Sequence, residues 1–269
     1  MSWILCTRMY DVTPAVRTHW HALLSSAARY AGVEVECIDH AAPAPLTELW
    51  TRHDLALAFV CGLPLATSYP RLRPLAATVT VLAKGESPTC CSVWLVRAEA
   101  AFDTLASTFG HRIGWTVGHS HSGFNAPRHA LLAHRSAERP RLFSESVGPL
   151  GHPRAALAAL GDRRIDVTAI DAYWWWLLQR HDAEAASRLR SIGHTENAPM
   201  PPLVCAADFP EAQAASLVTA LAAVHENSDM RTRLDALGVR RFAPVTRADY
   251  APLGEIDRDA RAAGYSLPA

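Results

Sequence analysis

The chain has 269 residues, of which 49% are hydrophobic and 19% are charged, and Lys plus Arg balance Asp plus Glu at 26 each. This apolar content is sufficient for one large globular core or two ordinary ones, and it excludes a disordered chain. The zero net charge does not favour a nucleic-acid partner or an anionic membrane surface, because both usually need a basic excess.

No stretch reaches the ~18 uninterrupted apolar residues of a transmembrane helix. The N-terminus, which reads MSWILCTR, lacks the basic start, long apolar run and small-residue cleavage site of a secretory signal. We therefore expect a periplasmic protein if an export signal has been removed, and a cytoplasmic protein if the chain is complete as written.

The cysteines predict reduced thiols. Four of them lie in apolar, strand-like contexts and are expected to be small buried hydrophobes: Cys6, Cys37, Cys61 and Cys205. The adjacent Cys90 and Cys91 would point to opposite faces of a strand, and no CxxC pair occurs, which argues against a zinc site. Reduced thiols favour a cytoplasmic setting.

Strands and helices alternate along the chain. Apolar or alternating runs predict strands over residues 3–7, 33–38, 54–61, 78–83, 91–97, 112–117, 141–147, 165–170, 189–193 and 203–206. Helical spacing predicts helices over residues 15–30, 46–50, 102–109, 128–133, 153–160, 172–180, 211–225 and 230–237, and a peripheral one over 249–264. This alternation predicts an α/β fold with mainly parallel sheets and helices on both faces.

The order of these elements predicts two α/β lobes joined by two hinge crossovers, near Val96 and Ala198. Pro199, Pro201 and Pro202 mark the second crossover, and we expect the helices after it to return to the first lobe. Lobe 1 is then discontinuous, with residues 1–95 and 199–269, and residues 96–198 form an inserted lobe 2.

The sharpest local signal is Ser120-His121-Ser122-Gly123, between a predicted strand and a helix. Backbone N–H groups of a first helical turn lack intrahelical partners, so two serine hydroxyls and a glycine that admits a ligand close to the backbone would complete an anion cradle. The alternative is a plain serine N-cap. His119 and His121 have no third metal ligand nearby, so we predict no metal site.

Two further residues lie where ligands bind in open α/β sheets, beyond the carboxyl ends of strands. His152 precedes a predicted helix and is either a donor to a ligand or a loop histidine facing solvent. Asp171 ends an apolar run and either accepts from a ligand hydroxyl or amine or caps the next helix.

The first half of the chain offers a similar loop. Cys61 and Gly62 follow the central predicted strand, and their backbone N–H groups, with the hydroxyl of Tyr69, are candidate ligand contacts. Tyr10, after the first strand, is another candidate. The adjacent Trp174-Trp175-Trp176 either pack against the sheet or form an aromatic wall or partner surface. Nucleotide-binding and hydrolase motifs such as GxGxxG, GxSxG and HExxH are absent.

At these residues the sequence resembles the phosphate/phosphite/phosphonate-binding subfamily of ABC-transporter substrate-binding proteins. The stretches that carry the likeness are DLALAFVCGLP at 54–64, SVWLVR at 92–97, SHSGF at 120–124, and 151–171, which begins GHP and ends RIDVTAID. The resemblance implies the type II periplasmic-binding-protein fold, hinged closure over a ligand and Ser120, His121 and Ser122 as anion donors. It also favours ligand contacts from His152 and Asp171.

We therefore expect a binding protein that holds a small phosphonate- or phosphate-like anion in a cleft between its lobes, as part of an ABC-type uptake system. An ABC-transporter permease is the expected protein partner, and no catalytic residue, metal or cofactor is predicted. Relatives of this fold include thiamin-pyrimidine enzymes, so a related enzyme remains an alternative, as does a cytoplasmic ligand sensor. Cys61 as a nucleophile would need a nearby general base.

Overall fold

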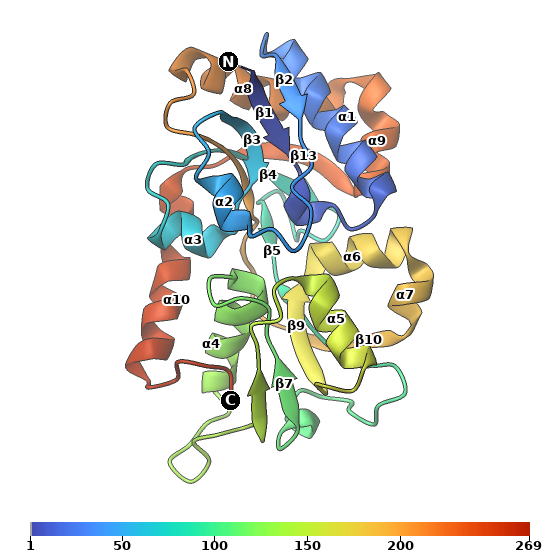
Figure 1. Cartoon of the computed structure of the whole chain (residues 1–269), viewed down its shortest axis with the longest axis vertical. Coiled ribbons are helices and arrows are strands. Elements are labelled where there is room, and N and C mark those ends of the chain that lie inside the picture. Colours follow the sequence, from blue (N-terminus) through green and yellow to red (C-terminus); the bar gives the residue numbers. More distant parts are fainter. Residues whose placement is uncertain (1) are drawn as a thin grey trace. The chain divides into compact units, whose positions relative to one another are not determined.

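The computed structural model describes residues 2–269, which form two compact units. Unit 1 contains the chain up to Thr89 together with Pro199–Ala251, and unit 2 contains Cys90–Ala198 and Pro252–Ala269. The chain passes between them in β5 (Thr89–Cys90) and β11 (Ala198–Pro199), which pair with each other, and again at the start of α10 (Ala251–Ala262) (Figure 1). Each unit is described by itself.

Unit 1 is built on a six-stranded sheet in the order β13-β4-β12-β3-β1-β2. Its strands are β1 (Trp3–Cys6), β2 (Val35–Cys37), β3 (Leu55–Phe59), β4 (Arg73–Thr80), β12 (Pro202–Cys205) and β13 (Val239–Pro244). β1, β2, β3 and β4 point one way, and β12 and β13 run antiparallel to them. Four of the six strands therefore share one direction, and three of the five strand pairs are antiparallel.

The helices of unit 1 are α1 (Pro14–Tyr30), α2 (Leu46–Trp50), α3 (Gly62–Thr67), α8 (Glu211–Ala223) and α9 (Arg231–Leu237). α1 begins where Thr13 Oγ1 accepts from Val16 N, with Pro14 in the first turn, and it buries an apolar stripe that includes Trp20. β3 is buried along its whole length, as its continuous apolar run predicts. β13 was not predicted, because its two central arginines break the apolar pattern.

Unit 2 contains a five-stranded sheet in the order β10-β6-β9-β7-β8. Its strands are β6 (Ser92–Arg97), β7 (Arg112–Gly114), β8 (Glu145–Val147), β9 (Val167–Asp171) and β10 (Leu189–His194). β7, β8 and β9 are parallel neighbours, and β6 is antiparallel to β9 and β10. Its helices are the π-helical turn η3 (His121–Asn125), α4 (Ala126–Leu132), α5 (Pro153–Gly161), α6 (Ala172–His181) and α7 (Ala183–Ser187), with most of α10.

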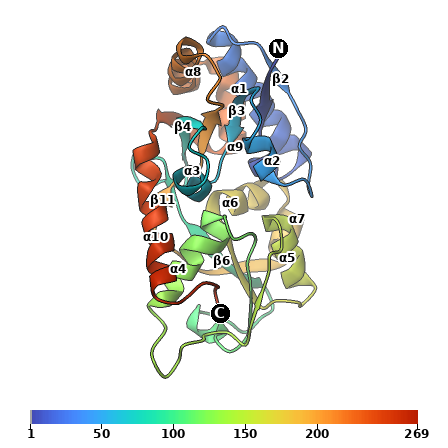
Figure 2. The same ribbon diagram turned by 60° about the vertical axis from the view of Figure 1, so that its left-hand side comes forward.

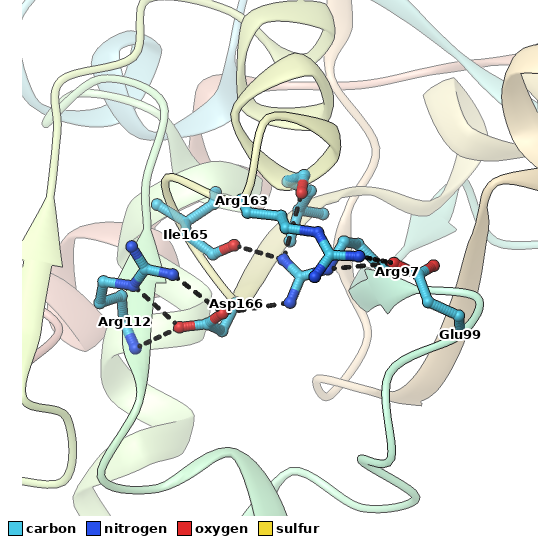
Figure 3. A network of polar contacts seen from close by, with 7 residues as sticks. Arg97, Glu99, Arg112, Arg163, Ile165 and Asp166 are labelled. Atoms are coloured by element: carbon cyan, nitrogen blue, oxygen red, sulfur yellow. Dashed lines mark hydrogen bonds and ion pairs between the residues drawn. The ribbon is translucent and has the colours of Figure 1, made fainter.

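An arginine–carboxylate network joins strands at the amino-terminal end of β9 (Figure 3). Asp166 accepts from Arg112 Nε at 3.0 Å and from Arg97 Nη2 at 3.2 Å, and Arg97 also donates to the Ile165 carbonyl. Arg163 and Arg97 flank Glu99 at the exposed rim. The network lies at the opposite end of β9 from Asp171, so it fastens the sheet at the end away from the candidate site.

The C-terminal segment differs from its predicted place. Residues 252–269 were expected in lobe 1, with a peripheral last helix, whereas the structure places Pro252–Ala269 in unit 2. Tyr265 belongs to the apolar core of that unit, and the Ala269 carbonyl accepts from Leu142 N at 3.0 Å. Residues 90–95 also belong to unit 2, because β6 pairs with β9 there.

Three local predictions differ from the structure. The helix predicted over 102–109 is reduced to a 3-10 turn at Ala106–Thr108, and only Glu145–Val147 of the strand predicted over 141–147 forms. Cys37, predicted to be buried, is exposed, because β2 is an edge strand.

Trp174 and Trp175 are buried and Trp176 is half-buried, stacked on Tyr173. Among residues 2–269, no helix is both long and apolar enough to cross a bilayer.

Candidate anion site

The Ser120–Gly123 stretch starts the helix formed by η3 and α4. Ser120 Oγ accepts from Gly123 N at 3.0 Å, so Ser120 is an N-cap, and the Ser120 carbonyl accepts from Asn125 N in a π-type turn. The Ser122 side chain is half-buried and forms no hydrogen bond within residues 2–269. Helix capping and anion binding at this turn are thus compatible, because Ser120 provides the cap and Ser122 would provide the hydroxyl donor to the anion.

Packing against Thr116 requires a glycine at position 123. A Cβ at this position would lie 2.1 Å from Thr116 Oγ1 and 3.0 Å from Thr116 Cβ. Pro127 lacks the N–H group that would bond the Gly123 carbonyl in an α-helix, and Thr116 N donates to that carbonyl instead, at 3.2 Å. The structure thus gives a packing reason for this glycine, and the approach of a ligand to its backbone stays a prediction.

Thr116, which was not predicted as a site residue, connects the loops at this edge of the sheet. Its backbone N–H bonds Gly123, and its carbonyl accepts from Gly151 N at 3.0 Å, next to His152. Its hydroxyl is buried without a hydrogen bond among residues 2–269. No sequence motif marks Thr116, because it looks like the end of a strand.

His152 and Asp171 both cap helices. His152 Nδ1 accepts from Ala155 N at 3.3 Å at the start of α5, which leaves the proton of a neutral ring on Nε2. Asp171, the last residue of β9, is 9% exposed, and its Oδ1 accepts from the N–H groups of Tyr173 and Trp174 at 2.8 and 2.9 Å. The structure thus shows the capping role of each residue.

Three helix starts therefore share one edge of the unit 2 sheet. The parallel strands β7, β8 and β9 are followed by η3–α4, α5 and α6, respectively. η3 also contacts β9 directly. Each start carries N–H groups and the positive end of a helix dipole, so this edge favours an anion.

His121 is buried at 7% exposure inside the first turn. Burial, and to a smaller extent His129, lowers its pKa to about 4. The ring is therefore neutral at physiological pH and can donate only one N–H. Burial also lowers the pKa of His119.

The predicted residues of unit 1 lie at the carboxyl ends of β1 and β3. Cys61 and Gly62 are buried at the start of α3, where Cys61 is the N-cap residue. Tyr69 is half-buried against Trp50, and burial raises its pKa; Arg247 Nη2 donates to its carbonyl at 3.0 Å.

Tyr10 is 1% exposed and packs edge-on against Phe59, with ring centroids 4.9 Å apart. The structure gives it a place in the core of unit 1. Among residues 2–269, no group of three or more His, Cys, Asp or Glu side chains is arranged to hold a metal ion.

Two α/β units, each with a sheet in which most strands share one direction, and linked by paired crossover strands, define the type II periplasmic-binding-protein fold. The chain belongs to the family described as "ABC transporter, phosphonate, periplasmic substrate-binding protein", whose model matches residues 13–250. No curated protein matches it.

Solved structures with this fold include complexes with different anions. A binding-protein component of an ABC phosphonate transporter from Pseudomonas aeruginosa is 14% identical, with a TM-score of 0.79 over 98% of this chain and 88% of that one. PhnD1 from Prochlorococcus marinus, in complex with methylphosphonate, is 19% identical, with a TM-score of 0.74 over 96% and 98%. Rpa4515 from Rhodopseudomonas palustris, with adipate, is 9% identical, with a TM-score of 0.66 over 97% of both chains.

Proposed function

We propose that this protein binds a small oxyanion of the phosphonate or phosphate type at the carboxyl edge of the unit 2 sheet. The observation that carries this proposal is the set of three helix starts that follow β7, β8 and β9, the first two of which are linked through Thr116. Membership of the phosphonate-binding family supports a phosphonate over other anions.

Each residue at this edge has a role in the proposal. The N–H groups of the first turn of η3, the Ser122 hydroxyl and the Nε2–H groups of His121 and His152 donate to the oxyanion. The Asp171 carboxylate accepts from a hydroxyl or ammonium group elsewhere on the ligand. In unit 1, Cys61, Gly62 and Tyr69 remain predicted contacts, and Tyr10 is left out because its side chain is buried.

Titration calorimetry and thermal shift test the proposal. The panel contains methylphosphonate, 2-aminoethylphosphonate, phosphite, phosphate, an alkyl sulfonate and adipate. A ligand at 100 times its Kd should stabilise the protein by about 2.7 kcal/mol. Failure of every phosphorus oxyanion to bind would refute the proposal, and binding of adipate alone would redirect it to dicarboxylates.

Ser122→Ala then tests the site. Loss of a hydrogen bond to a charged ligand should weaken binding by about tenfold or more. Ser187→Ala, on the exposed side of α7 in the same unit, is the matched control and should leave the Kd unchanged. Equal affinities of Ser122→Ala and wild type would place the anion elsewhere.

The cellular role follows from the family. The protein would act in the periplasm, deliver its ligand to an ABC-transporter permease and catalyse no reaction. Because the contact predicted for Cys61 is its backbone N–H, Cys61→Ala should leave ligand binding intact. Deletion of the gene should abolish growth on the bound phosphonate as sole phosphorus source, and unimpaired growth would argue against the uptake role.

A further inference from the structure

The helix that carries the candidate anion site is tied to the C-terminal segment by a buried polar chain. Arg128, in α4, has no exposed surface, and its guanidinium pairs with Asp257 of α10. It also donates to the Ser266 carbonyl at 3.2 Å and lies over the Phe124 ring at 4.9 Å. Figures 1 and 2 show α10 beside α4 within unit 2.

Asn125 connects this arginine to His121. Arg128 Nη2 donates to Asn125 Oδ1 at 3.1 Å, and Asn125 Nδ2 donates to the Leu253 carbonyl at 3.0 Å. Because arginine only donates and a carbonyl only accepts, these two contacts determine which end of the amide is oxygen and which is nitrogen. Asn125 is fully buried, so water does not compete for either end.

The orientation of this amide determines where His121 carries its proton. Asn125 Nδ2 lies 3.4 Å from His121 Nδ1. A donor at this position requires Nδ1 to be the acceptor, so the neutral ring carries its hydrogen on Nε2. An N–H on Nδ1 would instead face the amide N–H, and two donors would be opposed in a buried site.

We infer that Arg128 and Asn125, held by Asp257 of the C-terminal helix, are positioning residues that keep His121 as the Nε2–H tautomer, so that its ring offers a donor to the bound oxyanion. With the proton on Nδ1, Nε2 would present a lone pair, which repels an oxyanion. The inference rests on the proposed function for the role of the donor, whereas the tautomer itself does not depend on any ligand.

Asn125→Asp tests the inference with minimal change of shape. The new carboxylate can still accept from Arg128, but it has no hydrogen to give, so it should draw the His121 proton to Nδ1. At pH 8, ¹⁵N NMR of the imidazole should show the Nε2–H tautomer in wild type and the Nδ1–H tautomer in the variant. The Kd for methylphosphonate should rise by about tenfold.

Asp166→Asn is the matched control, because it disrupts another arginine–aspartate network of unit 2 that has no hydrogen bond to His121. It should lower stability and leave both the tautomer and the Kd unchanged. If Asn125→Asp does not fold, the pair Arg128→Met with Asp257→Leu removes both buried charges together. That variant should give a mixture of tautomers and weaker binding.

The outcomes separate the two proposals. An Nδ1–H tautomer in wild type, or an Nδ1–H variant that binds as tightly as wild type, overturns the inference. Absence of methylphosphonate and phosphate binding by wild-type protein with an Nε2–H His121 overturns the proposed function for these anions, and the positioning of the tautomer by Asn125 then stands without a ligand role.

Discussion

Gly123 and Thr116 show how closely two backbones approach at the candidate site. The Thr116 side chain occupies the space that a side chain at position 123 would need. The Thr116 N–H also donates to the Gly123 carbonyl, which Pro127 cannot do. His121, two residues before Gly123, is buried as a neutral ring. The site residues are therefore held by packing before any ligand arrives.

Gly123→Ala should destabilise the protein by about 1–3 kcal/mol, because the new Cβ overlaps Thr116. Gly118→Ala is the matched control in the preceding loop, since a Cβ there would meet nothing within 4 Å. Urea unfolding measures both. Adding Thr116→Ala should recover part of the loss, and an undiminished stability of Gly123→Ala would contradict the packing argument.

His121 makes stability depend on pH. Its pKa is about 4 when folded and 6.5 as the ordinary value, so between these values the unfolded chain binds the extra proton. The contribution of the neutral ring to stability is complete above pH 6.5 and is lost as the pH falls towards 4, where the loss amounts to about 3 kcal/mol. Unfolding free energies of wild type and His121→Gln from pH 4 to 8 should therefore converge on acidification. Parallel curves would contradict a neutral buried His121.

At the scale of elements, each of the three helix starts uses a side chain as its cap: Ser120, His152 and Asp171. The same positions were predicted as ligand contacts, because caps and anion sites need the same unpaired N–H groups. A cap residue can serve a ligand only through atoms that the cap does not use. Asp171 caps α6 through Oδ1.

Asp171→Asn separates capping from ligand binding, because asparagine caps a helix about as well as aspartate. Unfolding free energy should change by less than about 1 kcal/mol. Affinity for 2-aminoethylphosphonate should fall with loss of the carboxylate, and affinity for methylphosphonate should not. Asp182→Asn, which changes the cap of α7, is the control. Equal effects on the two ligands would remove Asp171 from the proposed site.

At the scale of the whole molecule, unit 2 is completed by residues far away in sequence. Arg128 and Asp257 are separated by 129 positions, and Tyr265 packs in the core with Trp94 and Ile113. A buried arginine without its carboxylate is strongly unfavourable. The last 18 residues, 252–269, are thus part of the framework of unit 2.

Truncation after Ala251 should destabilise unit 2 more than unit 1. Hydrogen exchange measured by mass spectrometry should increase in η3, α4 and β7 and change little in β1 and β3 of unit 1. A truncated protein with unaltered exchange in α4 would show that Arg128 does not need the C-terminal segment.

The sequence by itself determined the alternation of strands and helices and the polar residues at helix starts, because periodicity and capping act over a few residues. Only the tertiary structure decided that Gly123 faces Thr116, that Asn125 and Arg128 connect His121 to Asp257, and that residues 252–269 complete unit 2. Those contacts join residues up to at least 138 positions apart. No local pattern predicts them, since burial and hydrogen-bond partners are chosen only when the chain has packed.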